Sequence, residues 1–338
     1  MKILYAFQGT GNGHASRAIE IIPYLQQKAD VNILISGYQC ELQLPFEVKY
    51  KYYGLSFIFG KKGGIDFWST LKKAKFKNLY SEIKSIPLES YDLVINDFEP
   101  VTAWAAIFKN IPIISLSHQN AVLDKNAPKY GTYRFERLIL KYYAPAKVKF
   151  GFHFSTYSSA TFPPIIRKKI RYSNVTKKGH YTVYLPAYGD KKIIKVLSQI
   201  EDVKWEVFSK HTKKHIFKNN IIIKPINGND FIKSISSSKG VICGAGFETP
   251  AEALFLRKKL LVIPMKNQYE QQCNALALKQ IGVPVLKKLN KKQLPKISKW
   301  VNSKKIVEVN YPDVTEDILE ALILPYYNQT ILPQITIV

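Results

Sequence analysis

The sequence predicts an α/β protein of two domains, each with a parallel β-sheet and crossover helices. With 338 residues the chain is longer than one hydrophobic core usually supports, and its 46% hydrophobic residues can fill two. Short apolar runs bounded by turn residues alternate with segments of helix length, which is typical of parallel sheets. The alternation starts again at Tyr181, which predicts a second domain of the same class.

The first half of the chain opens with the apolar run Ile3 to Phe7, which predicts a buried strand, and a helix is expected from Ala15 to about Lys28. The elements expected next are a strand at 31–36, a helix near 68–86, a strand at 93–96, a helix at about 101–109 and a strand at 113–117. This order of strands and helices indicates a parallel sheet.

The second half repeats this order of elements. We expect strands at 181–185, 205–208, 221–224, 241–243 and 260–263, and helices at 191–200, 230–236, 250–255 and about 269–281. A last helix is predicted over 315–327, because Thr315 can cap it, two acidic residues follow in its first turn, and Pro325 can end it.

A Pro-rich break lies between the two halves. Phe162-Pro163-Pro164 and the polar, basic run to Gly179 place the hinge at about residues 155–180. The domains predicted are therefore 1–160 and 175–311.

The net charge of +25 indicates attraction to a polyanion: nucleic acid, an anionic membrane or a phosphorylated substrate. Residues 1–155 hold 20 Lys and Arg against 12 Asp and Glu, and residues 156–338 hold 30 against 13, so the second half is the more basic. A lysine bias spread over solvated faces explains the charge equally well.

Cysteines and hydropathy bear on the compartment. Cys40, Cys243 and Cys273 are far apart and outside any CxxC spacing, which predicts neither disulfides nor a zinc site. No apolar run reaches about 18 residues, and no charged leader precedes the first strand. These features predict a soluble, cytoplasmic protein.

The glycine-rich segment QGTGNGHASRA, residues 8–18, follows the first strand. The dinucleotide fingerprint would place a third glycine where His14 stands, and no Walker lysine is present, so neither a Rossmann NAD site nor a P-loop is supported. The segment does predict a loop that allows close approach of a ligand to the backbone, with His14 at a helix start and able to accept a proton. A tight turn with a solvent-facing histidine remains the alternative.

Asp97 ends the strand YDLVIND, and the carboxyl ends of parallel strands converge on one crevice. A carboxylate there can orient an imidazole, so His14 and Asp97 form a candidate general-base pair. The alternative is that Asp97 and Glu99 only cap the helix that Pro100 begins. His118 also ends a strand and is the reserve candidate.

A second glycine loop, CGAGFETPAEAL at 243–254, repeats the strand, loop and helix plan. Thr249, Pro250 and Glu252 fit a capping box, which is the structural interpretation. In the functional interpretation, amides of residues 246–251 hold a diphosphate, and Glu252 accepts hydrogen bonds from sugar hydroxyls. The segment NQYEQQCNA at 267–275 adds amides and a carboxylate suited to reading hydroxyls.

The combination of GTGNGH, Asp97 before Ala-Trp-Ala-Ala, GAGFETPAEAL and EQQCNA resembles the GT-B glycosyltransferases, most closely the branch with the bacterial transferase MurG and the glycosyltransferase 28-like proteins. The resemblance spans both domains. It implies two facing Rossmann-like domains across a cleft, with the acceptor on the first and the nucleotide-sugar on the second. It also implies that a C-terminal helix within residues 312–338 rejoins the first domain.

The resemblance implies roles for individual residues. His14 is the implied base, with Asp97 as its partner. The residues that resemble the donor-binding positions of the family are Gly244, Gly246, Phe247, Thr249, Glu252, Glu270, Gln271 and Asn274, and those expected on the acceptor side are Gly11, Asn12, Gly13 and His118. Gln8 and Asn12 replace two glycines of the MurG loop, which puts the identity of the acceptor in doubt.

The activity implied is inverting, metal-independent transfer of a sugar, with N-acetylglucosamine as one candidate, from a UDP-sugar co-substrate to an acceptor hydroxyl and with no further cofactor. The acceptor can be lipid-linked or membrane-associated, which would place the enzyme on the inner face of the cytoplasmic membrane. Three rivals stay open: a UDP-sugar 2-epimerase, a non-enzymatic sugar-nucleotide sensor and a nucleic-acid binder. No RRM, KH, helix-turn-helix or zinc signature supports the last, so no nucleic-acid partner is expected.

Residues 59–79 combine lysines with aromatic and aliphatic side chains. Trp68, Lys72 and Lys73 can therefore belong to a segment that binds an anionic membrane surface. The alternative is an ordinary helix with Trp68, Leu71 and Leu79 in the core and solvated lysines.

Overall fold

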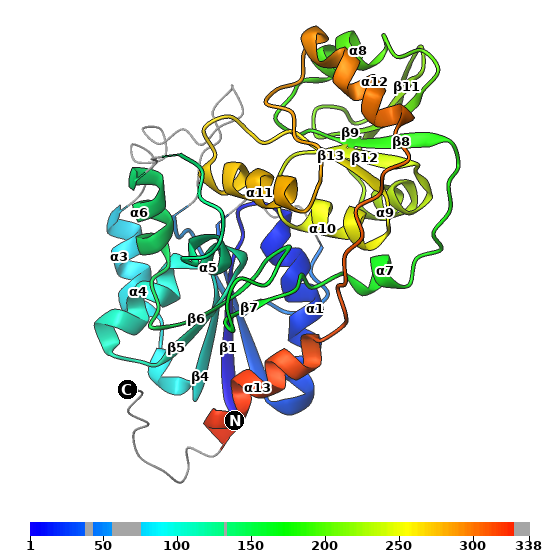
Figure 1. Cartoon of the computed structure of the whole chain (residues 1–338). Helices are drawn as coiled ribbons and strands as arrows, with labels where there is room; N and C mark the ends of the chain where they lie inside the picture. Colours follow the sequence, from blue (N-terminus) through cyan, green and yellow to red (C-terminus); the bar gives the residue numbers. More distant parts are fainter. Residues whose placement is uncertain (38–42, 56–75, 132–133, 328–338) are drawn as a thin grey trace.

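The computed structural model describes residues 1–37, 43–55, 76–131 and 134–327 of the chain. It contains two parallel sheets, each covered by helices, and Figure 1 shows them as two domains with helices α10 and α11 at their junction. We call the part that carries the seven-stranded sheet the first domain, and the part that carries the six-stranded sheet the second domain.

The sheet of the first domain has the strand order β3-β2-β1-β4-β5-β6-β7, and all its pairs are parallel. Its strands are β1 (Lys2–Gln8), β2 (Asp30–Ser36), β3 (Tyr50–Tyr52), β4 (Leu93–Asp97), β5 (Ile113–Leu116), β6 (Val148–Phe152) and β7 (Thr161–Phe162). The helices are α1 (Asn12–Lys28), α3 (Phe76–Ser85), α4 (Pro100–Lys109), α5 (His118–Leu123) and α6 (Arg134–Tyr143). Strand β1 lies between β2 and β4 inside the sheet, and every one of its side chains from Ile3 to Phe7 is buried.

The sheet of the second domain has the order β10-β11-β9-β8-β12-β13, with only β10 antiparallel to its neighbour. Its strands are β8 (His180–Tyr184), β9 (Lys204–Ser209), β10 (Ile216–Lys218), β11 (Ile221–Pro225), β12 (Gly240–Cys243) and β13 (Lys259–Val262). The helices are α8 (Asp190–Leu197), α9 (Gly228–Ser237), α10 (Glu248–Phe255), α11 (Tyr269–Gln280) and α12 (Leu294–Asn302), and a short α7 (Lys168–Arg171) precedes the domain. The predicted class, two parallel α/β domains, is confirmed.

One expectation about a helix start is wrong. Helix α10 begins at Glu248 after Phe247, and no side chain caps it, so Thr249 and Glu252 form no capping box. Thr249 is already the second residue of the helix and so cannot be its N-cap. Helix α13 (Thr315–Tyr327) has the predicted bounds, with Pro325 near its end. The predicted helix near 68–86 is described only from Phe76, and Trp68, Leu71, Lys72, Lys73 and Cys40 lie outside the described residues.

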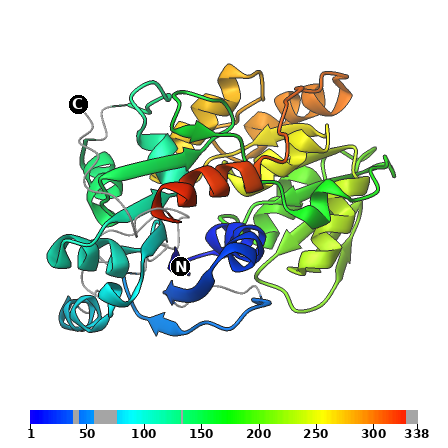
Figure 2. The ribbon, with the colours of Figure 1, turned by 90° about the horizontal axis from the view of Figure 1, so that it is seen from below.

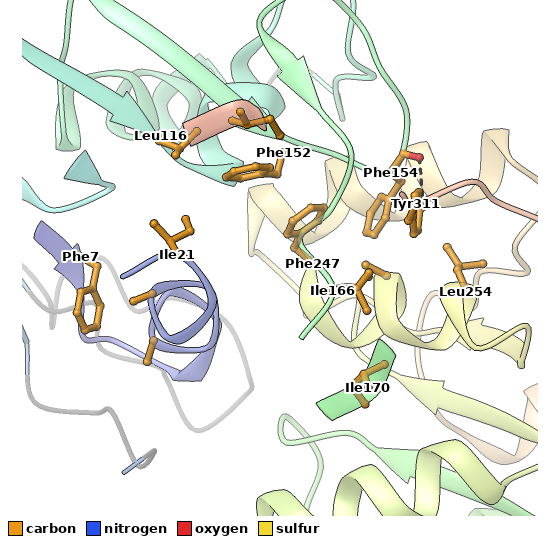
Figure 3. Close-up of a cluster of buried hydrophobic side chains, with 14 of the residues drawn as sticks. Phe7, Ile21, Leu116, Phe152, Phe154, Ile166, Ile170, Phe247, Leu254 and Tyr311 are labelled. Carbon is orange, nitrogen blue, oxygen red and sulfur yellow. Dashed lines mark hydrogen bonds between the residues drawn. The ribbon is translucent and has the colours of Figure 1, made fainter. Parts of the chain in front are cut away.

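The chain crosses between the domains twice, once before β8 and once before α13. Helix α13 lies beside α1, as Figures 1 and 2 both show, and Lys28 of α1 pairs with Glu320 of α13 at 3.2 Å. One hydrophobic cluster continues from the first domain through Phe152 and Phe154 to Phe247 and Tyr311 (Figure 3). The junction between the domains is therefore apolar at its centre.

Two neighbouring lysines hold both crossings to the second domain. Lys258 is buried, and its Nζ donates to the carbonyls of Thr176 at 2.7 Å and Ser238 at 2.9 Å. Lys259 Nζ donates to the carbonyls of Val301 at 2.6 Å and Ser303 at 3.1 Å. Because Thr176 belongs to the first crossing and Ser303 begins the second, each lysine anchors one of them.

Candidate active site

A cavity of about 810 Å³ lies between the two domains. The first domain contributes the β1–α1 loop, the first turns of α1 and part of α6, and the second domain contributes the N-termini of α10 and α11 and the ends of β8, β9 and β11. The carboxyl ends of parallel strands from both sheets thus face one space, which is where α/β proteins of this kind bind ligands.

His14 lies in the first turn of α1 and lines this cavity. The turn into α1 is made at Gly11, whose φ of 89° suits glycine. Strand β4 pairs with β1 so that Asp97 is the register partner of Phe7, which brings its carboxylate under the same loop. His14 Nδ1 and Asp97 Oδ1 are 2.9 Å apart, so the two residues that the sequence singles out are in contact.

Arg17, one helical turn after His14, is the residue that sequence reasoning missed. Its Nε and Nη2 contact the two Asp97 oxygens at 2.8 and 2.9 Å. Burial opposes ionisation of Asp97, but the charges of Arg17 and His14 outweigh it and hold the pKa of Asp97 below its usual range. The signal that could have found it is the spacing His-x-x-Arg at a helix start, which puts both side chains on one face.

Glu248 of α10 completes this cluster from the second domain. Arg17 Nη1 donates to Glu248 Oε1 at 2.7 Å, and the other carboxylate oxygen of Glu248 lies 2.7 Å from where a Cβ on Gly13 would stand. A side chain at position 13 would therefore collide with Glu248. The ion pair connects the two domains beside the cavity.

The turn after Asp97 is fixed by its own hydrogen bonds. Glu99 caps α4 by accepting from the amides of Val101 and Thr102, both at 2.7 Å, so the capping interpretation applies to Glu99 and not to Asp97. Phe98, between Asp97 and Glu99, has a φ of 56°, which is a strained value for a large residue. Its ring lies parallel to the ring of His14, with the two centroids 6.2 Å apart.

The second glycine loop lies at the N-terminus of α10. Gly246, Phe247 and Thr249 line the cavity, and a Cβ on Gly246 would meet no atom within 4 Å. Gly244 lies behind them, where a Cβ would be 3.4 Å from Gln271 Oε1. The helix end has no side-chain cap and points its amides toward this space.

Glu252 lines the same end of the cavity but is bound to a residue that the sequence did not indicate. Arg167 of the first crossing donates from Nε and Nη2 to the two Glu252 oxygens, at 2.5 and 2.8 Å. The Glu252 side chain is 3% exposed and that of Arg167 is 21% exposed. Burial tends to lower the pKa of Arg167, and the Glu252 carboxylate outweighs this and raises it.

Of the three α11 residues predicted to bind the donor sugar, two line the cavity and one does not. Glu270 lines the cavity and accepts from Gln119 Nε2 at 3.1 Å. Gln271 also lines it, and its Oε1 accepts from the Met265 amide at 3.0 Å. Asn274 is fully buried, outside the cavity lining, and contacts His118.

His118 also lies at the domain junction. Its Nδ1 is 2.8 Å from the Phe152 carbonyl, its Nε2 is 3.0 Å from Asn274 Oδ1, and its ring stacks on Phe247 at 4.0 Å. Burial lowers the pKa of His118. Both ring nitrogens thus contact the protein, although His118 also lines the cavity. Of the other residues expected on the acceptor side, Asn12 and Gly13 line the cavity and Gly11 does not.

Two further groups of residues line the cavity. Gln8 is buried under the loop, and its Nε2 lies within hydrogen-bond distance of the Thr10 hydroxyl, the Leu55 carbonyl and the Tyr143 hydroxyl. At the opposite end the lining includes three aromatic side chains and a helix-capping amide: Tyr184 and Phe208 near the ends of β8 and β9, Phe231 in α9, and Asn227 at the start of that helix. Aromatic side chains suit a stacked ring system.

Among the described residues there is no group of three or more His, Cys, Asp and Glu side chains that could hold a metal ion. In the same part of the chain, no helix is both long and apolar enough to cross a bilayer.

Two facing parallel α/β domains with a cavity between them define the GT-B class. A model of glycosyl transferase family 1 matches residues 1–303, so the chain belongs to that family and is a glycosyltransferase. Solved structures with the same fold include MurG of Acinetobacter baumannii, which is 16% identical with a TM-score of 0.59, the match covering 95% of this chain and 99% of that one.

Two other solved structures show how widely the fold is used. A UDP-N-acetylglucosamine 2-epimerase is 12% identical with a TM-score of 0.59, over 100% of this chain and 99% of that one. A spinosyn rhamnosyltransferase complexed with thymidine diphosphate is 12% identical with a TM-score of 0.59, over 98% and 99%. No curated protein is similar in sequence at a significant level.

Proposed function

We propose that this protein transfers a sugar from a UDP-sugar to an acceptor hydroxyl, with inversion and without a metal ion. The observation that carries the proposal is the contact of His14 with Asp97 in a cavity that also receives the uncapped N-terminus of α10. One side of the cavity thus offers a proton acceptor, and the other offers amides for an anionic leaving group.

The His14 ring has the geometry of a general base. When Nδ1 carries the proton and donates a hydrogen bond to Asp97, the lone pair of Nε2 is available to an acceptor hydroxyl. As the acceptor oxygen bonds to the anomeric carbon, its proton passes to Nε2, and the bond from that carbon to the diphosphate breaks with its electron pair leaving on UDP. A single displacement of this kind inverts the anomeric centre.

The donor would lie across the second domain. The α10 amides beside Gly246 and Thr249 stabilise the negative charge of the departing diphosphate, which is the role that a metal ion takes in other enzymes. Glu270 and Gln271 are placed to accept and donate hydrogen bonds to the sugar hydroxyls. The rings of Phe208 and Phe231, with centroids 5.2 Å apart, form a surface for the nucleobase.

Turnover of variants tests the base. His14→Ala should lower the rate by roughly 10² to 10⁴, and Asp97→Asn should lower it less, because the loss of a positioned base costs about that much. His215→Ala, an exposed histidine of the second domain, is the matched control. The anomeric configuration of the product by NMR and the rate in EDTA test inversion and metal independence. Parent-like rates in both variants would refute the base assignment.

A membrane-associated acceptor is supported by α6 at the rim of the cavity. Phe135, Leu138 and Tyr142 are 61%, 48% and 51% exposed at helical spacing, and Arg137 and Lys141 are exposed beside them. Apolar side chains flanked by cations suit an anionic lipid surface. Leu138→Asp and Tyr142→Asp should therefore weaken salt-sensitive cosedimentation with anionic vesicles, whereas Phe217→Asp, 72% exposed on β10, should not. No cosedimentation of the parent protein at low salt would exclude this acceptor class.

An epimerase is the second candidate, because four carboxylates line the cavity: Glu136, Glu248, Glu252 and Glu270. Acid and base groups on both sides of a bound sugar are what an epimerisation needs. Incubation with UDP-N-acetylglucosamine and no acceptor separates the two functions. A new UDP-sugar epimer would support the epimerase, and an unchanged donor that is consumed only when acceptor is added would support the transferase.

A further inference from the structure

Arg17 is the most highly connected charged group beside the cavity. Its side chain is 3% exposed, and it contacts the fully buried Asp97 of the first domain and the 27% exposed Glu248 of the second. One guanidinium thus pairs with two carboxylates that come from different domains. Only a planar fork with several donors can satisfy both, because a lysine ammonium lacks this geometry.

The position of Arg17 matters for His14. Arg17 Nη2 lies 3.1 Å from His14 Nδ1 and shares Asp97 Oδ1 with it. An aspartate alone would favour a proton on the imidazole, and a fixed cation at the same oxygen opposes that effect. Arg17 and Asp97 therefore act on His14 together.

The groups that face His14 come from several elements. Asp97 ends β4, Arg17 shares α1 with His14, and Glu248 reaches over from α10. The buried hydroxyl of Tyr5 on β1 lies behind Arg17 and Asp97, and burial, followed by the Asp97 charge, raises the pKa of Tyr5 well above its usual range, so it stays neutral. Glu136 of α6 and Glu270 of α11 line the same cavity.

Glu248 connects this cluster to the proposed donor site. It occupies the first turn of α10, whose N-terminal amides are the proposed diphosphate contacts. We propose that Arg17 is a positioning residue that holds the His14–Asp97 pair in place and couples it to the donor helix through Glu248. The inference rests on the proposed role of His14 as base. It implies that contact between the two halves of the cavity links the His14–Asp97 pair to the donor helix.

The test is an NMR titration of the His14 ring in the full chain, with His14→Gln used to assign its signal. In Arg17→Gln the unshielded Asp97 should move the midpoint upward by about one pH unit or more. In Glu248→Gln, Arg17 is left to Asp97 and His14 alone, and the midpoint should move downward. A purely structural role would lower the melting temperature of both variants without shifts of opposite sign.

A conservative variant and an independent one keep the test decisive. Arg17→Lys keeps the charge and should return the midpoint toward the parent value. Glu248→Gln leaves the buried Arg17–Asp97 pair intact, so it reports even when Arg17→Gln fails to fold. Shifts of the same sign, or no shift in Glu248→Gln, would overturn the coupling. The turnover rate of His14→Gln tests the base role separately from the coupling. A parent-like rate in this variant, together with the expected shifts in the Arg17 and Glu248 variants, would reject the base role and leave the coupling standing.

Discussion

Removing Arg167 should cost far more stability than removing its partner Glu252. Arg167 donates to both oxygens of a carboxylate that is only 3% exposed, so Arg167→Met leaves that carboxylate buried and unpaired. Breaking a buried pair in this way costs about 3–5 kcal/mol. Glu252→Gln leaves instead a guanidinium that lines the cavity and can be hydrated, so the cost is that of charged hydrogen bonds, about 1.5–3 kcal/mol.

Urea unfolding followed by tryptophan fluorescence measures this difference, since Trp205 and Trp300 lie in the core of the second domain. Lys28→Met is the control, because its pair with Glu320 is exposed and should contribute little to stability. The double variant Arg167→Met with Glu252→Gln should recover much of the loss. If Arg167→Met costs no more than Glu252→Gln, the buried carboxylate is not the reason for the pair.

The same variants test donor binding. If Glu252 binds the ribose of UDP, Glu252→Gln should also reduce the shift in melting temperature that UDP produces. An unchanged shift with lowered stability would leave Glu252 only its role as the partner of Arg167.

Two other predictions concern Gly13 and Lys258. Gly13→Ala should destabilise the parent protein, because the added methyl group would displace Glu248 from Arg17. In a Glu248→Ala background the same substitution should stabilise the protein by about 0.4–1 kcal/mol. Urea midpoints that change with the same sign in both backgrounds would contradict this prediction. Burial, followed by the charge of Lys177, lowers the pKa of Lys258 to about 8. The unfolded chain therefore binds this proton more tightly than the folded chain does, so the free energy of unfolding should rise between pH 8 and 10.5 by up to about 1.4 kcal/mol per pH unit. Lys258→Met should lack that rise in unfolding experiments across this range.

The pattern of strands and helices was predictable because buried parallel strands are short apolar runs. The elements missed in the first domain include β6 (VKFGF), which is only five residues long, and α6, although the apolar residues of α6 do recur at helical spacing. Their burial is decided by neighbouring segments, as when Gly151 of β6 packs against the backbone of Ala121. Local pattern does not contain that information.

Half of the charged cluster at the site could be read from the sequence. His14 and Asp97 were predictable since both follow strands that end at one edge of a sheet. Glu248 was not, because its role depends on a contact with Arg17 of the other domain, 2.7 Å apart in space and 231 positions apart in sequence, and Arg17 was missed although its spacing from His14 indicates a shared helix face. The capping box at Thr249 failed because α10 starts at Glu248, two residues before the predicted start at position 250.

The anchoring of both crossings by Lys258 and Lys259 has a consequence for building chimeric enzymes. Thr176 and Ser303 are bound to the second domain, and Arg171 also donates to the carbonyl of Tyr311, which ties one crossing to the other. A second domain exchanged with that of a relative should therefore be spliced before Thr176 and after Ser303, so that the inserted module brings its own attachment of both crossings. A junction placed at the start of β8 would separate Lys258 from its carbonyl and release the first crossing.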